Sequence, residues 1–530
     1  MKIKIPIITK LLDKNAKNKL RVINKGRRQL KSENKQGLFI KLSNTLARVK
    51  LGKADSLNAL SGRINFDIDL SMRQYLILNI LSLSFNKSVL YSVGSNKALS
   101  HPLPREWRKA LSEQGVRVNN FRSALLWRVH GLLFFGRGFF RGLQSIYFLL
   151  MQSSDFKKYV YFDRLDKKCF SQNLNRHNIV NWYLQWKGRI NGIDSICHSV
   201  NGSKDFQIET INLIQTDGLP KLKGIRLFQY VIFVIYASIY SFLRLFFDPI
   251  YGFFLEELLK FKRISLAADE DLARDYLFNN SNSIYRPFWT YIAEERGARV
   301  LFYFYSTNNE GFKTKKGYSV QSLWYLMSWP YYLVWDKYQA DFVKRFDQDG
   351  SIIEVVGPIW FSSNNTDVDV PLNSVSVFDI TPKRLSMYIL LGLSFEYYTP
   401  NIANQFLSDI QVVLSQNNIN MLHKVKRKNQ STDKRCKSKI NQLIREPNYI
   451  GVDPSSDANQ VIQKTNACIS MPFTSTAIIA KQEGKSSVYY DPSGTIQKDD
   501  RAAHGIPILS GIDELRKWVE SLSMKDHANN

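Results

Sequence analysis

Apolar and polar residues alternate in short blocks along the second half of the chain, from about residue 255. Short apolar runs read as buried strands at residues 299–305, 332–335, 352–356, 374–380, 419–423, 449–452, 468–471 and 487–490. Amphipathic stretches at 338–345, 402–415, 458–465, 477–483 and 514–521 read as helices between or after them. Strands that alternate with helices in this way are typical of parallel α/β sheets.

A polar segment at residues 362–373 has no helical periodicity and separates two such blocks. We therefore predict an α/β fold with two Rossmann-like domains that face a cleft. The N-terminal domain spans residues 71–365, the C-terminal domain spans 374–525, and residues 1–70 form a basic arm. The polar, basic segment 429–439 reads as a loop.

Residues 121–260 read as an apolar helical insertion in the first domain, and 255–277 as a further helix. The stretch 227–243 carries no charge, with Arg226 and Arg244 at its flanks. Seventeen uncharged residues are at the lower limit for a membrane span. A span, a helix lying in the membrane interface and a buried core helix all stay open.

The formal net charge of +27 on 530 residues indicates an anionic partner. Nucleic acid, an anionic membrane surface and anionic substrates such as nucleotide sugars or lipid diphosphates are the three candidates. Residues 1–60 hold sixteen lysines and arginines against three acidic residues, which suits either a solvated arm or a membrane contact. No nucleic-acid-binding motif appears, and we expect no nucleic-acid partner.

The four cysteines are widely spaced and form no CxxC pair or Cys/His cluster. A zinc site and a disulfide framework are therefore not expected. The N-terminus lacks the features of a signal peptide, so a cytoplasmic location is the simplest expectation.

The segment 467–492 contains a strand, the turn Pro-Phe-Thr-Ser-Thr, a helix and a second strand. The hydroxyls of Thr474, Ser475 and Thr476 lie at the N-terminus of this helix, where free N–H groups and the helix dipole suit a phosphate. An ordinary helix cap explains the same residues when the turn is taken alone.

Several polar residues follow predicted strands, where open α/β sheets bind ligands. A sugar hydroxyl that acts as nucleophile needs a carboxylate base. The candidate bases are Glu310, Asp336 and Glu294, with Glu295 and Asp379 as two further possibilities. Asp336 equally suits a helix cap, and Glu294 or Glu295 a surface ion pair. The candidates for nucleotide or cleft contacts are Asp379, Glu396, Asp491, Asp499, Asp500 and His504. Asp499, Asp500 and His504 equally suit a role in shaping a loop.

The stretches MPFTSTAIIAKQEGKSSVYYDP, DDRAAHGIPIL, YRPFWTYIAEERG, VWDKYQADFVKR and VVGPIWF resemble the bacterial polysaccharide-biosynthesis proteins named for a Pro-Phe-Thr-Ser motif. The resemblance covers about residues 255–518. It implies the GT-B architecture of glycosyltransferases, in which two Rossmann-like domains enclose the cleft.

Similarity to transferases that use CMP-linked sugars implies a donor-phosphate site in the C-terminal domain. Lys424 and Lys426 take the place of a Lys-x-His-Pro-like motif there, and Thr474, Ser475 and Thr476 supply the second element. The sequence departs from the first pattern because Lys-Val-Lys-Arg replaces Lys-x-His-Pro, which puts the identity of the nucleotide in doubt.

GT-B enzymes generally need no metal, and we expect neither a metal nor a cofactor. Two Asp-x-Asp pairs occur, at 67–69 before the first predicted strand and at 367–369 in the hinge. We expect neither pair to bind a metal ion.

The resulting hypothesis is a cytoplasmic glycosyltransferase of capsule or O-antigen synthesis, peripherally associated with the inner membrane. It would move a sugar from a nucleotide-sugar donor to a lipid-linked or glycan acceptor, close to the anionic membrane surface. The alternatives are a nucleotide-sugar 2-epimerase-like enzyme and a non-catalytic scaffold of polysaccharide assembly.

Overall fold

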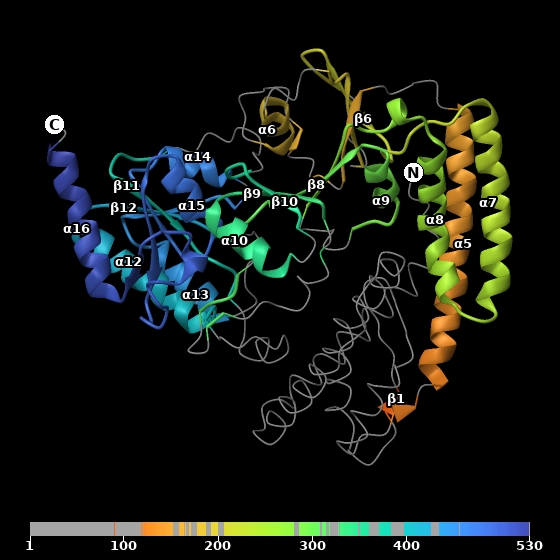
Figure 1. Ribbon diagram of the computed structural model, residues 1–530. Coiled ribbons are helices and arrows are strands. Elements are labelled where there is room, and N and C mark those ends of the chain that lie inside the picture. The colour runs from red at the N-terminus through yellow and green to blue at the C-terminus, as the bar shows by residue number, and fades with distance from the viewer. Residues whose placement is uncertain are drawn as a thin grey trace.

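The computed structural model describes residues 89–90, 118–119, 121–151, 158–163, 165, 169–170, 178–186, 192–199, 206–279, 286–307, 310–313, 317–318, 327, 329–347, 350–359, 370–382, 397–425, 434–454 and 456–528. They form two α/β domains and a layer of long helices (Figure 1). The predicted basic arm and the Asp-x-Asp pairs at 67–69 and 367–369 lie outside the described residues, as does most of the predicted hinge.

The C-terminal domain has a six-stranded sheet in the order β13-β12-β11-β14-β15-β16, with every neighbouring pair parallel. Its strands are β11 (Ser374–Phe378), β12 (Asn420–Lys424), β13 (Tyr449–Val452), β14 (Ala467–Ser470), β15 (Ser486–Asp491) and β16 (Ile508–Ser510). The chain starts at the centre, moves outward to β13, and returns to β14 beside β11. This is the doubly wound Rossmann order, with its switch point between β11 and β14.

Helices connect these strands and cover the sheet. They are α12 (Pro400–Gln416), α13 (Lys434–Leu443), α14 (Ala458–Gln463), α15 (Ser475–Gln482), the 3₁₀ turn η6 (Arg501–Ala503) and α16 (Ile512–Ala528). Local sequence sets their ends: the Thr399 hydroxyl caps α12, and Pro400 occupies its first turn, where a missing N–H costs nothing.

The N-terminal domain has an eight-stranded sheet in the order β10-β9-β8-β7-β3-β4-β6-β5, in which only the β5–β6 pair is antiparallel among the described strands. The strands are β3 (Tyr159–Phe162), β4 (Ser195–His198), β5 (Phe206–Ile208), β6 (Ile211–Gln215), β7 (Asp275–Asn279), β8 (Arg299–Tyr303), β9 (Tyr331–Val334) and β10 (Ile352–Val355). A separate parallel pair joins β1 (Val89–Leu90) to β2 (Val118–Asn119). The switch point of the large sheet lies between β3 and β7.

The helices of this domain are α5 (Phe121–Met151), α6 (Ile179–Gln185), α7 (Gly224–Leu245), α8 (Ile250–Leu266), the 3₁₀ turn η4 (Asp269–Asp271), α9 (Trp289–Glu295) and α10 (Lys337–Phe346). Helices α5, α7 and α8 lie side by side on the side of the molecule remote from the C-terminal domain (Figure 1). Large aromatic side chains, including Phe278, Phe302, Trp329 and Tyr332, fill the interior beside β7, β8 and β9.

The carboxyl ends of the two sheets face each other. Thr307 follows β8 in one domain, and its hydroxyl lies 3.3 Å from that of Ser475, which follows β14 in the other. Asp336 follows β9, and its carboxylate contacts His504, which lies between β15 and β16. The predicted fold class, two Rossmann-like domains that face one another, is confirmed.

Three local predictions differ from the structure. The region 121–260 is not a helical insertion, because it also contains β3, β4, β5 and β6. The single helix predicted at 255–277 is α8 followed by η4 and the first residues of β7. The loop predicted at 429–439 includes the start of α13, which buries Cys436 and Leu443.

Candidate active site

The turn after β14 lies at the switch point of the C-terminal sheet. Its hydroxyls form a network: Thr474 Oγ1 donates to the Met471 carbonyl at 2.8 Å and lies 3.2 Å from Thr476 Oγ1, which is 2.9 Å from Ser470 Oγ. The Thr474 side chain is the N-cap residue of α15 but makes no capping hydrogen bond. The first N–H groups of an α-helix have no intrahelical acceptor, so this turn presents donors toward the other domain.

Phe473 holds the turn in a strained conformation. Its φ angle is +61°, a left-handed value that costs a side-chain-bearing residue free energy. The buried ring packs against Tyr489 within the domain and against Phe312 of the N-terminal domain, with the latter centroids 4.9 Å apart. Packing on both sides therefore fixes the turn that carries the hydroxyls.

Lys424 ends β12, two strands away from β14 in the sheet. Its Nζ donates to the Pro454 carbonyl at 3.3 Å, on the β13 side of the strand. This contact lies on the β13 side of β12, whereas the Thr474–Thr476 turn follows β14 on the other side of β11. Lys426 lies outside the described residues.

Asp379 follows β11, at the other side of the same switch point. Its carboxylate lies 3.3 Å from Nε2 of the fully buried His423, within ion-pair distance but without hydrogen-bond alignment. The other ring nitrogen of His423 is 2.9 Å from the Tyr449 hydroxyl. Burial, followed by the charge of Asp379, raises the pKa of Tyr449 to about 12, so this phenol stays protonated.

Glu310 is held in ion pairs rather than facing an open cleft. Its buried carboxylate lies 2.5 Å from Arg345 of α10 and 2.7 Å from Nε of Arg501 in the other domain. Both guanidinium groups contact the same carboxylate oxygen, Oε1. The geometry favours a role in joining the domains.

Asp336 joins the domains in the same way. One oxygen accepts the N–H of Gln339 and caps α10, and the other lies 2.6 Å from Nδ1 of His504. His504 has a φ angle of +54° and lies against the ring of Tyr338. Asp336 therefore caps α10, which is the second of the two roles predicted for it. His504 contacts the N-terminal domain through Asp336.

Asp499 and Asp500 also contact the N-terminal domain. Asp499 pairs with Lys313, which lowers the pKa of its exposed carboxyl. Asp500 is buried, accepts the Lys313 N–H at 2.8 Å and the Tyr318 hydroxyl at 3.0 Å, and caps η6. The DDRAAHG stretch thus forms much of the contact between the domains.

Asp491 is fully buried at the end of β15 and shapes a loop. It accepts hydrogen bonds from the Tyr397 hydroxyl at 2.8 Å, from the N–H and hydroxyl of Ser493, and from the Ile496 N–H at 2.8 Å. These four bonds occupy its oxygens, so a nucleotide contact through this side chain has no support in the geometry. Glu396 lies outside the described residues.

Glu294 pairs with the buried Arg286 near the end of α9. That helix leads into the amino end of β8, so Glu294 lies toward the sheet edge opposite the facing strand ends. Its neighbour Glu295 ends the same helix. Glu294 therefore forms an ion pair, which was the alternative predicted for it. The structure does not bring it to the other candidate residues.

A carboxylate that the sequence patterns did not single out, that of Asp163, lies at the switch point of the N-terminal sheet. Asp163 follows β3, its N–H donates to the Leu277 carbonyl of β7 at 2.9 Å, and one oxygen accepts the Tyr161 hydroxyl at 3.3 Å. Burial, followed by the Asp163 charge, raises the pKa of Tyr161 well above its usual value. The sequence signal that could have identified Asp163 is the short apolar run YVYF directly before it.

Among the described residues, no group of three His, Cys, Asp or Glu side chains is placed to hold a metal ion. The prediction that the reaction needs no metal stays a prediction.

Comparisons with known proteins place these observations in context. The family model for polysaccharide biosynthesis PFTS motif proteins matches residues 238–519. A search of curated proteins finds no match.

Solved structures with a similar chain path include a putative UDP-N-acetylglucosamine 2-epimerase from Listeria monocytogenes, at 8% identity and a TM-score of 0.34, covering 69% of this chain and 88% of that one. The glycotransferase of kitacinnamycin is similar at 11% identity and a TM-score of 0.35, covering 69% and 90%. A UDP-glucosyltransferase from Polygonum tinctorium is similar at 9% identity and a TM-score of 0.30, covering 69% and 82%. Likeness at this level does not bear on the chemistry of this chain.

Proposed function

The chain belongs to the family of polysaccharide biosynthesis PFTS motif proteins, and from this premise we propose that it is a GT-B glycosyltransferase of bacterial capsule or O-antigen synthesis. It moves a sugar from a nucleotide-sugar donor, with CMP-linked sugars as one option, to a lipid-linked or glycan acceptor. The observation that carries the proposal is the Thr474–Thr476 turn at a Rossmann switch point, opposite the strand ends of a second Rossmann-like domain.

The turn supports the departure of the nucleotide. When the bond between the sugar and the donor phosphate breaks, negative charge grows on the phosphate oxygen. Donors fixed at the N-terminus of α15 and the hydroxyls of Ser475 and Thr476 stabilise that charge without having to reorganise. Lys424 adds a positive charge once it leaves the Pro454 carbonyl.

Asp163 is the carboxylate best suited to accept the proton of the acceptor hydroxyl. It is half-buried at the switch point of the N-terminal sheet, where ligands bind in open α/β folds. Glu310 and Asp336 contact Arg345, Arg501 and His504 and join the two domains. A base in the N-terminal domain and a leaving-group site in the C-terminal domain place the reacting sugar between the two sheets.

Calorimetric titration of the purified chain with CMP, UDP, GDP and dTDP tests the donor site. We expect one nucleotide to bind, Ser475→Ala and Thr476→Val to weaken it about 5- to 30-fold, and the exposed control Lys437→Ala to leave it unchanged. Absence of binding at millimolar nucleotide would refute the transferase and the epimerase alike, and would favour the scaffold.

A sugar-nucleotide turnover assay separates the two enzyme classes. With the cognate donor, a transferase releases nucleotide in step with glycosylation of an added polyprenyl-linked acceptor. We expect Asp163→Asn to lower kcat at least about 100-fold while nucleotide affinity is retained. Conversion of the nucleotide sugar to its epimer without acceptor would show an epimerase instead.

A further inference from the structure

Helix α7 has its apolar side chains on the outside. Its buried residues are Tyr230, Val234, Ala237, Ser238 and Ser241, of which three are small and only Tyr230 is large. Its exposed residues include Ile225, Phe228, Ile232, Ile235, Ile239 and Leu243. A helix on the surface of a water-soluble protein shows the opposite distribution.

Helix α5 continues this apolar surface. Among the described residues, only five exposed large apolar side chains lie outside α5, α7 and the turn that follows α7: Ile352, Val355, Leu372, Val412 and Ile444. Contiguous apolar patches of this kind mark an interaction surface.

The charges on the two helices are all positive. Neither α5 nor α7 contains an aspartate or glutamate, whereas Arg128, Arg226 and Arg244 are exposed on them. Arginines beside an apolar helix face are suited to the phosphates of anionic lipid headgroups. The surface therefore complements an anionic lipid surface in both its apolar and its charged parts.

Glycines bring the helices of this layer into close contact. A Cβ atom on Gly252 of α8 would lie 2.0 Å from the Gly131 carbonyl oxygen of α5. A Cβ on Gly142 would lie 2.9 Å from Leu259 and 3.0 Å from Val234. Small residues between helices and large apolar residues outside them are typical of helices that pack in lipid.

Helix α7 is long and apolar enough to cross a bilayer by composition alone. However, both ends of the α7–α8 hairpin connect to the same sheet, since α7 follows β6 and α8 leads to β7. If α7 crossed the membrane, α8 would have to return through it with five charged residues along its length: Glu256, Glu257, Lys260, Lys262 and Arg263. The cost of burying these charges in hydrocarbon opposes a crossing.

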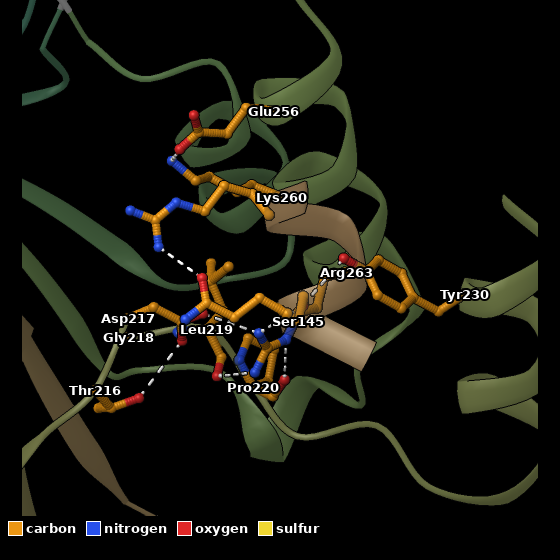
Figure 2. Close-up of polar contacts among 12 residues, drawn as sticks. Ser145, Thr216, Asp217, Gly218, Leu219, Pro220, Tyr230, Glu256, Lys260 and Arg263 are labelled. Carbon is orange, nitrogen blue, oxygen red and sulfur yellow. Dashed lines mark hydrogen bonds and ion pairs between the residues drawn. The ribbon is translucent and has the colours of Figure 1, made fainter. Parts of the chain in front are cut away.

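A buried arginine fastens the helix layer to the N-terminal sheet (Figure 2). Arg263 of α8 donates to the Pro220 and Leu219 carbonyls at 2.8 and 3.1 Å and pairs with Asp217 at 2.9 Å, in the loop after β6. It also contacts Ser145 of α5, whose hydroxyl accepts from Tyr230 of α7. One side chain thus links all three helices to the carboxyl edge of β6.

We propose that the exposed faces of α5 and α7 embed side-on in one leaflet of an anionic bilayer, with their arginines at the headgroups. This extends the proposed function, because it fixes the carboxyl edge of the N-terminal sheet relative to the membrane from which a lipid-linked acceptor is drawn. It does not require the donor site, so each idea can fail without the other.

Flotation of the full chain with vesicles tests the surface. We expect strong binding to phosphatidylcholine mixed with phosphatidylglycerol, and weaker, salt-insensitive binding to phosphatidylcholine alone. Ile235→Asp and Ile239→Asp should each lower the partition coefficient about tenfold or more, whereas the equally exposed control Ile444→Asp should not. An unchanged melting temperature and circular-dichroism spectrum show that each variant is folded.

Two outcomes would overturn the proposal. One is that vesicles do not bind while the chain forms a dimer that Ile235→Asp dissociates, which would make the surface a contact between copies. The other is that a Phe247→Cys variant reacts with a membrane-impermeant maleimide in intact spheroplasts, which would place the turn after α7 across the membrane. We expect that thiol to react only after lysis.

Discussion

The Nε atom of Arg501 lies 2.7 Å from Oε1 of Glu310. This contact joins the C-terminal domain to the N-terminal domain through two residues that are far apart in the sequence. Glu310 also neutralises Arg345, and its side chain is only 7% exposed. Removing it leaves two guanidinium groups without their carboxylate in a partly buried contact, where the desolvation cost is no longer compensated.

Glu310→Gln should therefore weaken the contact between the domains. We expect a loss of about 2–3 kcal/mol in the free energy of unfolding, less than for a fully buried pair because Arg501 is partly solvated. Chemical denaturation measures it, and small-angle scattering should show a more open chain. The exposed pair of Asp341 and Lys344 supplies the control, since Asp341→Ala should change stability by less than about 0.5 kcal/mol. Equal effects would contradict the interpretation.

The C-terminal domain could be predicted closely because its signals are local. Strands β11 and β14 are short runs buried on both faces, and turn residues or caps bound the helices of the domain. Helix α13 was missed because its polar, basic composition hides a weak apolar stripe at Cys436, Ile440 and Leu443.

The N-terminal sheet was harder to predict because its strands between the long helices are atypical. Strand β4 contains the buried polar residues Ser195 and His198, and β6 alternates apolar with polar residues over only five positions. Short strands that depend on their neighbours for burial carry little local signal.

Local sequence patterns were also too weak to predict how the candidate site is arranged. Asp499, Asp500 and His504 were predicted because they follow a predicted strand, but the residues that contact them, Lys313 and Asp336, lie more than 150 residues earlier in the chain. Pattern and spacing can place a side chain at a strand end. They cannot show whether a distant residue already pairs with it.

Position 473 offers a test of the strained turn. Replacing Phe473 with alanine removes a buried ring that packs on both domains and should cost about 3–5 kcal/mol. Phe473→Gly removes the same ring but relieves the left-handed φ of +61°. The glycine variant should therefore be more stable than the alanine variant by about 1 kcal/mol. The opposite order in thermal unfolding, which is usual at ordinary positions, would show that the turn is not strained.

The Tyr397–Asp491 pair offers a test of a structural carboxylate. Tyr397→Phe removes a 2.8 Å hydrogen bond to a fully buried charge and should cost about 1.5–3 kcal/mol. Burial and the Asp491 charge both raise the pKa of this phenol, so the loss should not change between pH 6 and 9. Nucleotide affinity, measured on folded protein, should stay within about twofold. A large loss of affinity at full stability would restore Asp491 as a ligand contact.

Cys468 provides a chemical probe beside the proposed phosphate-binding turn. It is fully buried in β14, and burial raises the pKa of its thiol to about 11. A thiol with a raised pKa has little reactive thiolate at pH 8, so native protein should react with a disulfide reagent at this residue only when the strand opens.

A nucleotide that binds at Thr474–Thr476 stabilises the closed state and should slow labelling of Cys468. At a hundredfold excess over Kd we expect about a 100-fold decrease in rate, read by mass spectrometry of the labelled peptide. Cys197, buried in β4 of the other domain, is the matched control. Its labelling rate should decrease less than that of Cys468, unless the two domains open together. Slowing at Cys197 alone would place the nucleotide in the N-terminal domain and contradict the proposed donor site.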